Sequence, residues 1–502
     1  MEHNTKELFE FANRKSHAEE NSEYISHGYL YDSYLRLRVR RSAQIPALII
    51  IGIILFGLLV PLFFLGRGNE MNSYYAKKPP RIALFGGENI VIGGTRVKNY
   101  NEKAYIRLLA IGIGGDIDGV GDKNTNSRSP VKALRSVTTG SDGSGLYRAR
   151  VDSYLEVGFI YKTVTQEEYK RITEFEKESG HRVLFPLINE NDYSMLDANL
   201  WYRVNESGEA INKQGELIKL RDGELTERLT DNYKRNEDGE LVYSAYVGGG
   251  DFDTAELRVR VLYHNYYRYN TGNVPSFIFG TDTQGYDLVR RVAGGVRFSL
   301  LIAFGVSIIN ILIGCAVGAI SGYFGGWVDI GVQRVSEILS GVPFIVVATL
   351  FQIHLANRVG IAPSLLFAFV LTGWIGLSGR VRAQVYKAKG QEFILASRTL
   401  GGDSAHIILR HIFPNIIGNI ITASALMIPG VIFSESILSY LGIVNLRSGE
   451  LSSLGTLMSD AGSVWTGYPH LMLFPALFIS LLMICFNIFA SALRDAMNPS
   501  AE

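Results

Sequence analysis

The stretch GQEFILASRTLGGDSAHIILRHIFPN (390–415) interrupts the apolar C-terminal part of the chain. It consists of two short amphipathic segments separated by the pair Gly401-Gly402. Because glycine adopts the left-handed turn at little cost, this pair predicts the end of a first helix. Asp403 or Ser404 can then cap a second helix by accepting backbone N–H bonds. The stretch therefore predicts a rigid helix–turn–helix between two apolar segments.

The first segment has a helical repeat of its own. Phe393, Ala396, Ser397 and Leu400 are spaced to share one helical face. Pro414 suits the first turn of the membrane helix that follows, where its missing N–H does no harm. The residues alone leave two interpretations equally open: an element that transmits force from a partner, or a basic loop that only anchors its helices.

The rest of the chain separates into charged and apolar regions. It has 502 residues, 47% of them hydrophobic, with a formal net charge of +1. A helix that crosses about 30 Å of hydrocarbon needs roughly 20 apolar residues. Six stretches reach that length without an acidic or basic residue: 45–66, 299–328, 338–356, 359–379, 415–434 and 468–493. Backbone groups must pair internally in lipid, so we expect six membrane helices.

Lysine and arginine in short flanks predict the orientation. The segment YLRLRVRR (34–41) carries four arginines before the first apolar stretch and places the N-terminus in the cytoplasm. Six crossings then put residues 67–298 outside the membrane and the C-terminus inside. The basic segment 380–414 falls on the cytoplasmic side, in agreement. Arginines at 290, 291 and 297 disagree, so we assign residues 286–298 to an interfacial helix.

These expectations divide the chain as follows: a cytoplasmic tail (1–44), a first membrane helix retained as an anchor (45–66), an extracytoplasmic inserted domain (67–285), the interfacial helix (286–298), and five further helices (299–499) with a cytoplasmic loop at 387–414. We expect the inserted domain to be β-rich α+β, without a convincing repeat. Alternating apolar residues in 153–164 and 256–269 predict strands. The segment 161–179 predicts a helix with a threonine cap.

The loop resembles that of a known transporter family. Binding-protein-dependent ABC importer permeases carry Glu-Ala-Ala, three residues, Gly, about ten residues and then Ile-x-Pro. Here the corresponding residues are Leu395-Ala396-Ser397, Gly401 and Ile412-Phe413-Pro414.

Further segments resemble the dipeptide/oligopeptide branch of that family, and specifically the shorter of its two permease subunits. They are FGTDTQGYDLVRR (279–291), GYFGGWVD (322–329), RVRAQV (380–385), ILRHIFPN (408–415), SILSYLG (436–442) and LRDAMNP (493–499). The resemblance covers about 276–499 and the first membrane helix. It implies the type I ABC importer permease fold.

The resemblance also implies a function. A permease of this kind is not an enzyme: it forms a translocation pathway with a second permease, and two ATPase subunits bind ATP and Mg²⁺. A solute-binding protein delivers oligopeptides or dipeptides, although relatives carry nickel, glutathione or oligosaccharides. The location implied is the bacterial plasma (inner) membrane, with no nucleic-acid partner. The residues expected to contact or hinge against an ATPase are Glu392, Phe393, Ala396, Ser397, Arg398, Gly401, Gly402, Asp403 and Pro414.

The chain departs from the family pattern at three places. Leu395 stands where the motif has Glu, although Glu392 lies one turn earlier, and Tyr286 stands where such permeases often carry Arg. The inserted domain is also much longer than the usual external loop. That domain keeps open a second class of function, a receptor whose external domain binds a signal.

Three other sets of residues are candidates for packing or binding. Gly314, Gly318 and Gly322 lie four apart on one helical face, which favours close helix packing over pore lining. Glu435 lies near the external end of the fifth apolar stretch. An ionisable residue there is a candidate pathway residue, but its position favours a side chain that reaches the interface.

DIDGVGD (116–122) gathers Asp116, Asp118 and Asp122 around two glycines, as a Ca²⁺ site or as an ordinary polar turn. The chain contains no G-x-x-x-x-G-K-[ST] phosphate loop, so we expect it to bind no ATP itself.

Overall fold

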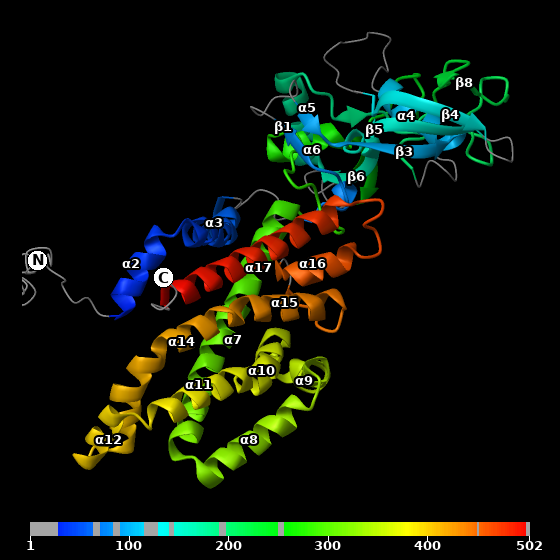
Figure 1. Cartoon of the computed structure of the whole chain (residues 1–502). Coiled ribbons are helices and arrows are strands. Elements are labelled where there is room, and N and C mark those ends of the chain that lie inside the picture. The colour runs from blue at the N-terminus through cyan, green and yellow to red at the C-terminus, as the bar shows by residue number, and fades with distance from the viewer. Residues whose placement is uncertain are drawn as a thin grey trace, which may run out of the picture.

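The computed structural model describes residues 29–63, 71–83, 91–114, 129–139, 145–189, 197–248, 256–448 and 451–497. Figure 1 shows two parts: an extended set of helices, and a separate domain of helices and strands above one end of it. We call them the helical part and the insert domain, which is residues 71–287 between α3 and α7. Residues 1–28 of the expected cytoplasmic tail (1–44) lie outside the described residues, and residues 29–44 form α2 and the start of α3.

The helical part is made of two N-terminal helices and a longer C-terminal series. The bounds are α2 Tyr29–Val39, α3 Arg41–Phe63, α7 Leu288–Phe324, α8 Gly326–Ser340, α9 Phe344–Val359, α10 Ile361–Gly373, α11 Ile375–Ala388, α12 Glu392–Thr399, α13 Ser404–His406, α14 Phe413–Ala425, α15 Met427–Tyr440, α16 Leu454–Ala461 and α17 His470–Met497. A short hairpin, β12 Arg447–Ser448 and β13 Leu451–Ser452, precedes α16.

Within the described residues, five helices are long and apolar enough to cross a membrane, and six if one bent pair counts as a single crossing. The bent pair is α8 and α9, which meet at 78°. Val342 precedes Pro343, and proline disfavours the helical conformation in the residue before it. The expected uninterrupted crossing at 338–356 is therefore wrong, because it lies across this bend.

The expected interfacial helix at 286–298 is not a separate helix. Those residues begin α7, a single helix of 37 residues whose N-terminus Asp287 caps by accepting the Val289 N–H at 2.9 Å. Arg291 need not reach the interface, because it is buried in an ion pair with Asp282, 2.9 Å between Nε and Oδ2. The cluster of Arg290, Arg291 and Arg297 therefore does not mark a surface as a whole, because Arg291 is neutralised inside the protein.

The insert domain contains small antiparallel sheets covered by helices. Three strands pair in the order β3-β5-β4, and β10, β11 and β6 form a second sheet that β7 joins at β11. The bounds are β1 Arg81–Ala83, β2 Val91–Gly93, β3 Thr95–Asn101, α4 Glu102–Ile113, β4 Val131–Thr139, β5 Gly145–Asp152, β6 Phe159–Thr165, α5 Gln166–Ser179, β7 Leu184–Phe185, β8 Leu220–Arg221, β9 Glu224–Leu225, β10 Ser244–Gly248, β11 Glu256–Leu262 and α6 Tyr263–Thr271.

Two sequence patterns proved to span a change of structure. The segment 256–269 is a strand only to Leu262, and its tyrosine-rich second half is α6. The segment 161–179 begins as the end of β6, and the helix starts at Gln166 behind Thr165. The Thr165 hydroxyl does accept the Glu168 N–H at 3.2 Å, so the threonine cap was predicted correctly.

The insert domain has a repeat that the sequence analysis missed. The pattern N-x-x-G-E occurs at residues 205–209, 212–216 and 236–240. In each copy the asparagine Oδ1 accepts the glutamate N–H, at 2.7 to 2.9 Å, and the glycine has a positive φ of 73° to 90°. The copies are hairpin turns that recur along the edge of an aromatic core around Trp201 and Tyr233.

The insert domain touches the helical part through Arg96 on β3. Its Nη2 donates to the Gly467 carbonyl at 2.8 Å, and its guanidinium lies 3.9 Å from the centre of the Tyr468 ring. Nearby, Phe279 stacks on Phe474 with ring centroids 4.1 Å apart. The start of α17 and the end of the insert domain therefore form one contact.

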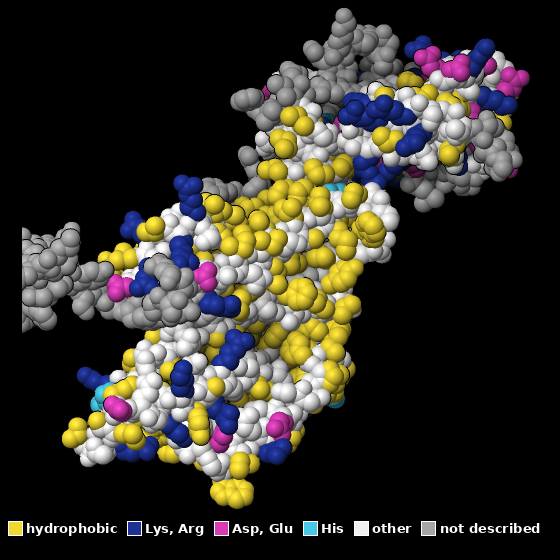
Figure 2. Space-filling view, in the orientation of Figure 1, with side chains coloured by type: hydrophobic (Ala, Val, Ile, Leu, Met, Phe, Trp, Pro, Cys, Tyr) yellow, Lys and Arg dark blue, Asp and Glu magenta, His cyan; other side chains and the backbone are white. Residues whose placement is uncertain are grey.

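The surface differs between the parts. Figure 2 shows hydrophobic side chains over much of the middle of the helical part, whereas charged side chains gather on the insert domain and toward the far end of the helices. An apolar band between two charged ends is what a membrane crossing requires.

Candidate functional site

The element around α12 lies at the end of the helical part farthest from the insert domain (Figure 1). The helix Glu392–Thr399 ends as the glycine pair predicts: Gly401 has φ +83°, and the Gly402 N–H donates to the Ser397 carbonyl at 3.0 Å. A Cβ on Gly402 would lie 2.8 Å from that carbonyl oxygen. The turn therefore requires glycine for two separate reasons.

The predicted common face of α12 lies on the exposed side of the helix. Ile394 is 0% exposed, whereas Phe393, Ala396 and Leu400 are exposed, Leu400 at 88%. The i, i+3, i+4, i+7 spacing thus defines one face of α12, and that face is directed mainly to solvent. One isoleucine holds α12 to the protein and leaves an apolar surface uncovered.

The second half of the element is continuous with the helix after it. Asp403 caps it, because its Oδ2 accepts the Ala405 N–H at 3.2 Å, and Ser404 is the first helical residue. One turn of π-helix, Ile407–Ile412, then leads into α14. Pro414 lies in the first turn of α14, but no break precedes it, since residues 404–440 form one potential crossing.

A small core supports this element from within. Ile394, Ile407 and Ile412 are fully buried against Val385 of α11 and Tyr323 of α7. The Arg398 guanidinium lies 5.4 Å from the centre of the Tyr323 ring. Displacement of α12 would open this core, so α12 is coupled mechanically to α7 and α11.

The glycines of α7 lie at its contact with α11. A Cβ added at Gly318 would be 2.5 Å from the Ser378 carbonyl oxygen, and one at Gly322 would be 2.7 Å from that of Arg382. At Gly314 the Leu377 Cβ would be 3.1 Å away. Such distances allow the two backbones to approach only because the side chains are absent.

Comparison with known proteins assigns this arrangement to a family. Residues 314–502 match the family described as "Binding-protein-dependent transport system inner membrane component". The oligopeptide transport system permease protein OppC of Bacillus subtilis is 38% identical over 221 residues, which are 44% of this chain and 71% of that protein. The chain belongs to this family.

Other relatives are similar over the same share. OppC of Haemophilus influenzae is 40% identical over 222 residues, or 44% of this chain and 70% of that protein. The dipeptide transport system permease protein DppC of Lactococcus lactis is 37% identical over 238 residues, or 47% of this chain and 68% of that protein. The protein is thus a multi-pass inner-membrane permease subunit of an ABC importer, with the type I permease fold, rather than a receptor.

Sequence reasoning missed an ion pair of the permease that joins α8 to α11. The guanidinium of Arg382 grips both carboxylate oxygens of Asp329, with Nη2 to Oδ2 at 2.5 Å, and Ser321 of α7 donates to the same carboxylate at 2.5 Å. The planar guanidinium donates two parallel hydrogen bonds to the two carboxylate oxygens, which fixes the geometry of the contact. Both residues stand in the segments 322–329 and 380–385 that carried the family resemblance, so the signal was present in the sequence.

The permease places Glu435 differently from the expected interfacial position. The side chain is 0% exposed, within α15. Ser299 of α7 and Ser439 each donate a hydroxyl to its carboxyl group at 2.9 Å. The prediction that it reaches the membrane surface is wrong, because these hydroxyl groups provide its polar contacts inside the helical part.

The candidate calcium turn at Asp116, Asp118 and Asp122 lies outside the described residues. Among the residues that are described, no group of three or more His, Cys, Asp or Glu side chains is arranged to hold a metal ion.

Proposed function

We propose that this permease carries short peptides across the membrane and that α12 docks on a partner ATPase. The observation that carries the proposal is the uncovered apolar surface of α12, which is anchored by one buried residue, Ile394. An exposed apolar patch on a rigid element is typical of a protein contact site. The names of the relatives, oligopeptide and dipeptide permeases, support the peptide assignment.

The transport cycle follows from this arrangement. ATP and Mg²⁺ bind to two partner ATPases, which close and displace α12. The contacts of α12 with α7 and α11 then shift the permease between inward-open and outward-open states, because each state makes different contacts. A second, different permease completes the pathway, a solute-binding protein delivers the peptide, and this chain performs no chemistry. Glu392, Ala396, Ser397 and Arg398 are the proposed contact residues, with Gly401 as the hinge.

In the proposed orientation, α12 and both termini are cytoplasmic and the insert domain is extracytoplasmic. The Arg40–Asp495 ion pair, 3.6 Å, supports a common side for the two ends of the chain. The insert domain contains no cysteine, so Ser207→Cys and Thr399→Cys, each made in a chain whose Cys315 and Cys485 are replaced by alanine, test the orientation. A membrane-impermeant maleimide should label the first in intact cells and the second only after lysis. The opposite pattern would reverse the orientation.

The coupling role is tested by substitution at Gly401. Gly401→Val places a branched side chain at a residue with φ +83°, where an added Cβ would meet no atom within 4 Å. The substitution therefore strains the backbone of the hinge and causes no clash with neighbouring residues. Uptake of labelled peptides and peptide-stimulated ATP hydrolysis should fall more than about tenfold, with normal membrane insertion. Gly360→Val is the matched control, since Gly360 also has a positive φ (95°) and only an ordinary contact with Pro363 at 3.6 Å. An equal loss of uptake and of ATP hydrolysis in both variants would reject a special role for Gly401.

The substrate is tested separately, by uptake of labelled peptides of graded length in cells with and without this chain. Uptake of peptides that depends on the chain supports the assignment. Chain-dependent uptake of nickel, glutathione or an oligosaccharide, with no uptake of any peptide, would replace it while leaving the coupling role intact.

A further inference from the structure

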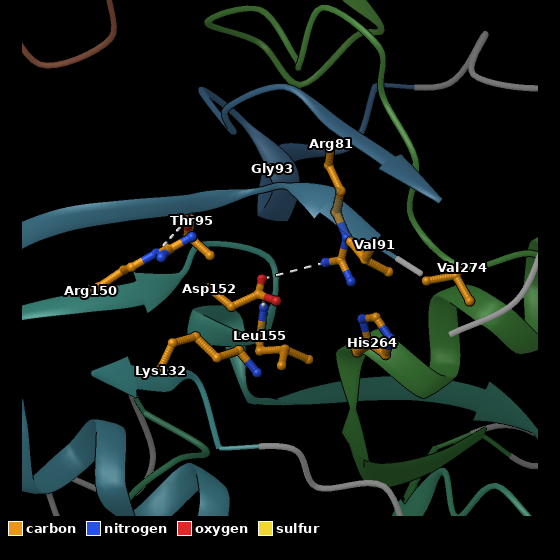
Figure 3. A pocket seen from close by; sticks show the side chains of 10 residues that line it. All are labelled: Arg81, Val91, Gly93, Thr95, Lys132, Arg150, Asp152, Leu155, His264 and Val274. Carbon is orange, nitrogen blue, oxygen red and sulfur yellow. Dashed lines mark hydrogen bonds and ion pairs between the residues drawn. The ribbon is translucent and has the colours of Figure 1, made fainter. Parts of the chain in front are cut away.

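The insert domain contains a cavity of about 410 Å³, in a region that precedes the family match at residues 314–502. It opens between the ends of the two sheets, where β1, β5 and the start of α6 meet (Figure 3). Pockets for small ligands have volumes of about 300–1,000 Å³. This cavity is therefore of the right size for a compact organic molecule.

The cavity is strongly basic. Arg81, Lys132 and Arg150 line it with a single carboxylate, Asp152. Arg81 and Asp152 are buried at its base, whereas Lys132 and Arg150 lie exposed at its rim, where Arg150 Nε donates to the Thr95 hydroxyl at 3.1 Å. The described lining residues thus include three cations and one anion, a composition that favours an anionic ligand.

Arg81 retains hydrogen-bonding capacity. Its side chain is 3% exposed in the protein, and its Nη1 lies 3.4 Å from Asp152 Oδ1, a long contact for a charged pair. The same Oδ1 also accepts the N–H groups of Tyr154 and Leu155, at 3.0 and 3.3 Å. Arg81 Nε has no hydrogen-bond partner among the described residues. A buried donor without a partner is costly, and a ligand oxygen would satisfy it.

The walls are partly apolar. Val91, Leu155 and Val274 contribute hydrocarbon surface, and the buried imidazole of His264 faces the same space (Figure 3). Such walls favour a ligand with a carbon skeleton over a bare inorganic ion, because burial of apolar surface stabilises the complex.

We propose that this cavity binds a small organic acid, whose carboxylate lies against Arg81 and whose carbon skeleton packs on the three apolar side chains. Lys132 and Arg150 increase the local concentration of the anion at the entrance. The site is separate from the helical part, so this proposal holds whether or not the permease carries peptides.

The test uses the purified full chain in nanodiscs and isothermal titration with acetate, propionate, succinate and glutamate as probes. At least one acid should bind, and its neutral amide should not. Affinity should fall as salt is raised, because the rim charges are exposed and screened. Failure of all four acids to bind would overturn the proposal. Inorganic phosphate that binds as tightly as the best acid would overturn the organic-acid assignment, because the apolar walls would then contribute nothing.

Variants locate the site. Asp152→Asn keeps an oxygen for the Tyr154 and Leu155 N–H groups but removes the competing charge, so the acid should bind about tenfold more tightly. Unfolding cannot produce such a gain. The double variant Lys132→Gln/Arg150→Gln should weaken binding about tenfold. Its control, Arg135→Gln/Arg148→Gln, removes the same charge from exposed positions on the same two strands, outside the cavity. Equal weakening by both double variants would overturn the assigned location.

Discussion

The helical part and the insert domain are stabilised in different ways. Where α7 meets α11, small residues bring two backbones together, as at Gly318 and Ser378. In the insert domain the cores are aromatic, with stacked pairs such as Tyr105–Tyr147 at 4.9 Å and Trp201–Tyr233 at 5.7 Å.

The difference follows from the solvent around each part. Lipid tails are as apolar as leucine, so helices in a bilayer gain little from burying large side chains and associate through close packing. In water, burial of a ring is itself strongly favourable. Within the helical part, enlarging a glycine should therefore destabilise the protein only where two helices touch, and different regions should respond to different perturbations.

The largest effect is expected at the glycine contact. Gly318→Leu must displace the α11 backbone, because even a Cβ would lie 2.5 Å from the Ser378 oxygen. We expect a loss of more than about 3 kcal/mol and little folded protein by fluorescence size-exclusion chromatography. Gly305→Leu, on the same helix with no atom within 4 Å of its added Cβ, should fold normally. Similar yields for the two variants would show that close packing does not hold α7 to α11.

The second effect is a pH dependence at the junction of the two parts. Burial raises the pKa of Asp287, the N-cap of α7, to about 6, above its ordinary value of 3.8. The folded protein therefore holds a proton that the unfolded chain has lost between pH 4 and 6. Stability should fall as the pH rises through that window, by up to roughly 3 kcal/mol.

Asp287→Asn retains a capping oxygen but cannot ionise. Its melting temperature in detergent should lose the decrease between pH 4 and pH 7 that the parent protein shows. Asp238→Asn, an exposed turn residue, should retain the parent's pH profile. A profile unchanged by Asp287→Asn would mean that the carboxyl group is ionised without cost.

A smaller effect is expected for the ion pair between Arg382 and Asp329, whose side chains are 36% and 19% exposed. A double-mutant cycle with Arg382→Gln and Asp329→Asn should give a coupling energy of about 1–2 kcal/mol, because the contact is bidentate but partly solvated. The measurement is chemical denaturation in detergent. If the two single substitutions lower the free energy of unfolding by amounts that add up to the loss in the double variant, the two residues act independently.

The smallest effect should come from the contact between the two parts. Arg96→Gln removes a cation over the Tyr468 ring and a hydrogen bond to Gly467, at a cost of about 1 kcal/mol. Hydrogen exchange should increase in β3 and at residues 464–469, whereas Arg148→Gln should leave both unchanged. Unaltered exchange at residues 464–469 would mean that Arg96 does not hold the two parts together.

Much of the helical part could be predicted from sequence, since apolar length located the five described helices that are long enough to cross a membrane and glycine geometry located the end of α12. The failures have particular causes. Local charge placed residues 286–298 at an interface, but Arg291 is neutralised by Asp282, which precedes the helix by only a few residues. Position along a helix placed Glu435 near the surface, but hydroxyl groups from two helices accommodate it inside.

The insert domain was less predictable because its signals are local and mixed. Strand-like alternation in 256–269 continues into α6, since tyrosine suits either structure when a core covers it. The N-x-x-G-E turns were readable in the sequence, because asparagine bonds its own backbone and glycine supplies the positive φ. The basic cavity was not readable, since Arg81, Lys132 and Arg150 come together only when three strands are placed in space.

The length of α7 has a mechanical consequence. A helix of 37 residues extends about 55 Å, well beyond the roughly 30 Å of hydrocarbon. Its first turn is fastened into the folded domain by Asp282 and Arg291, and its last turns lie against α11 beside the α12 element. This single helix therefore connects the insert domain directly to the α12 element. A tilt of α7 at the insert domain must also move its other end, beside α12.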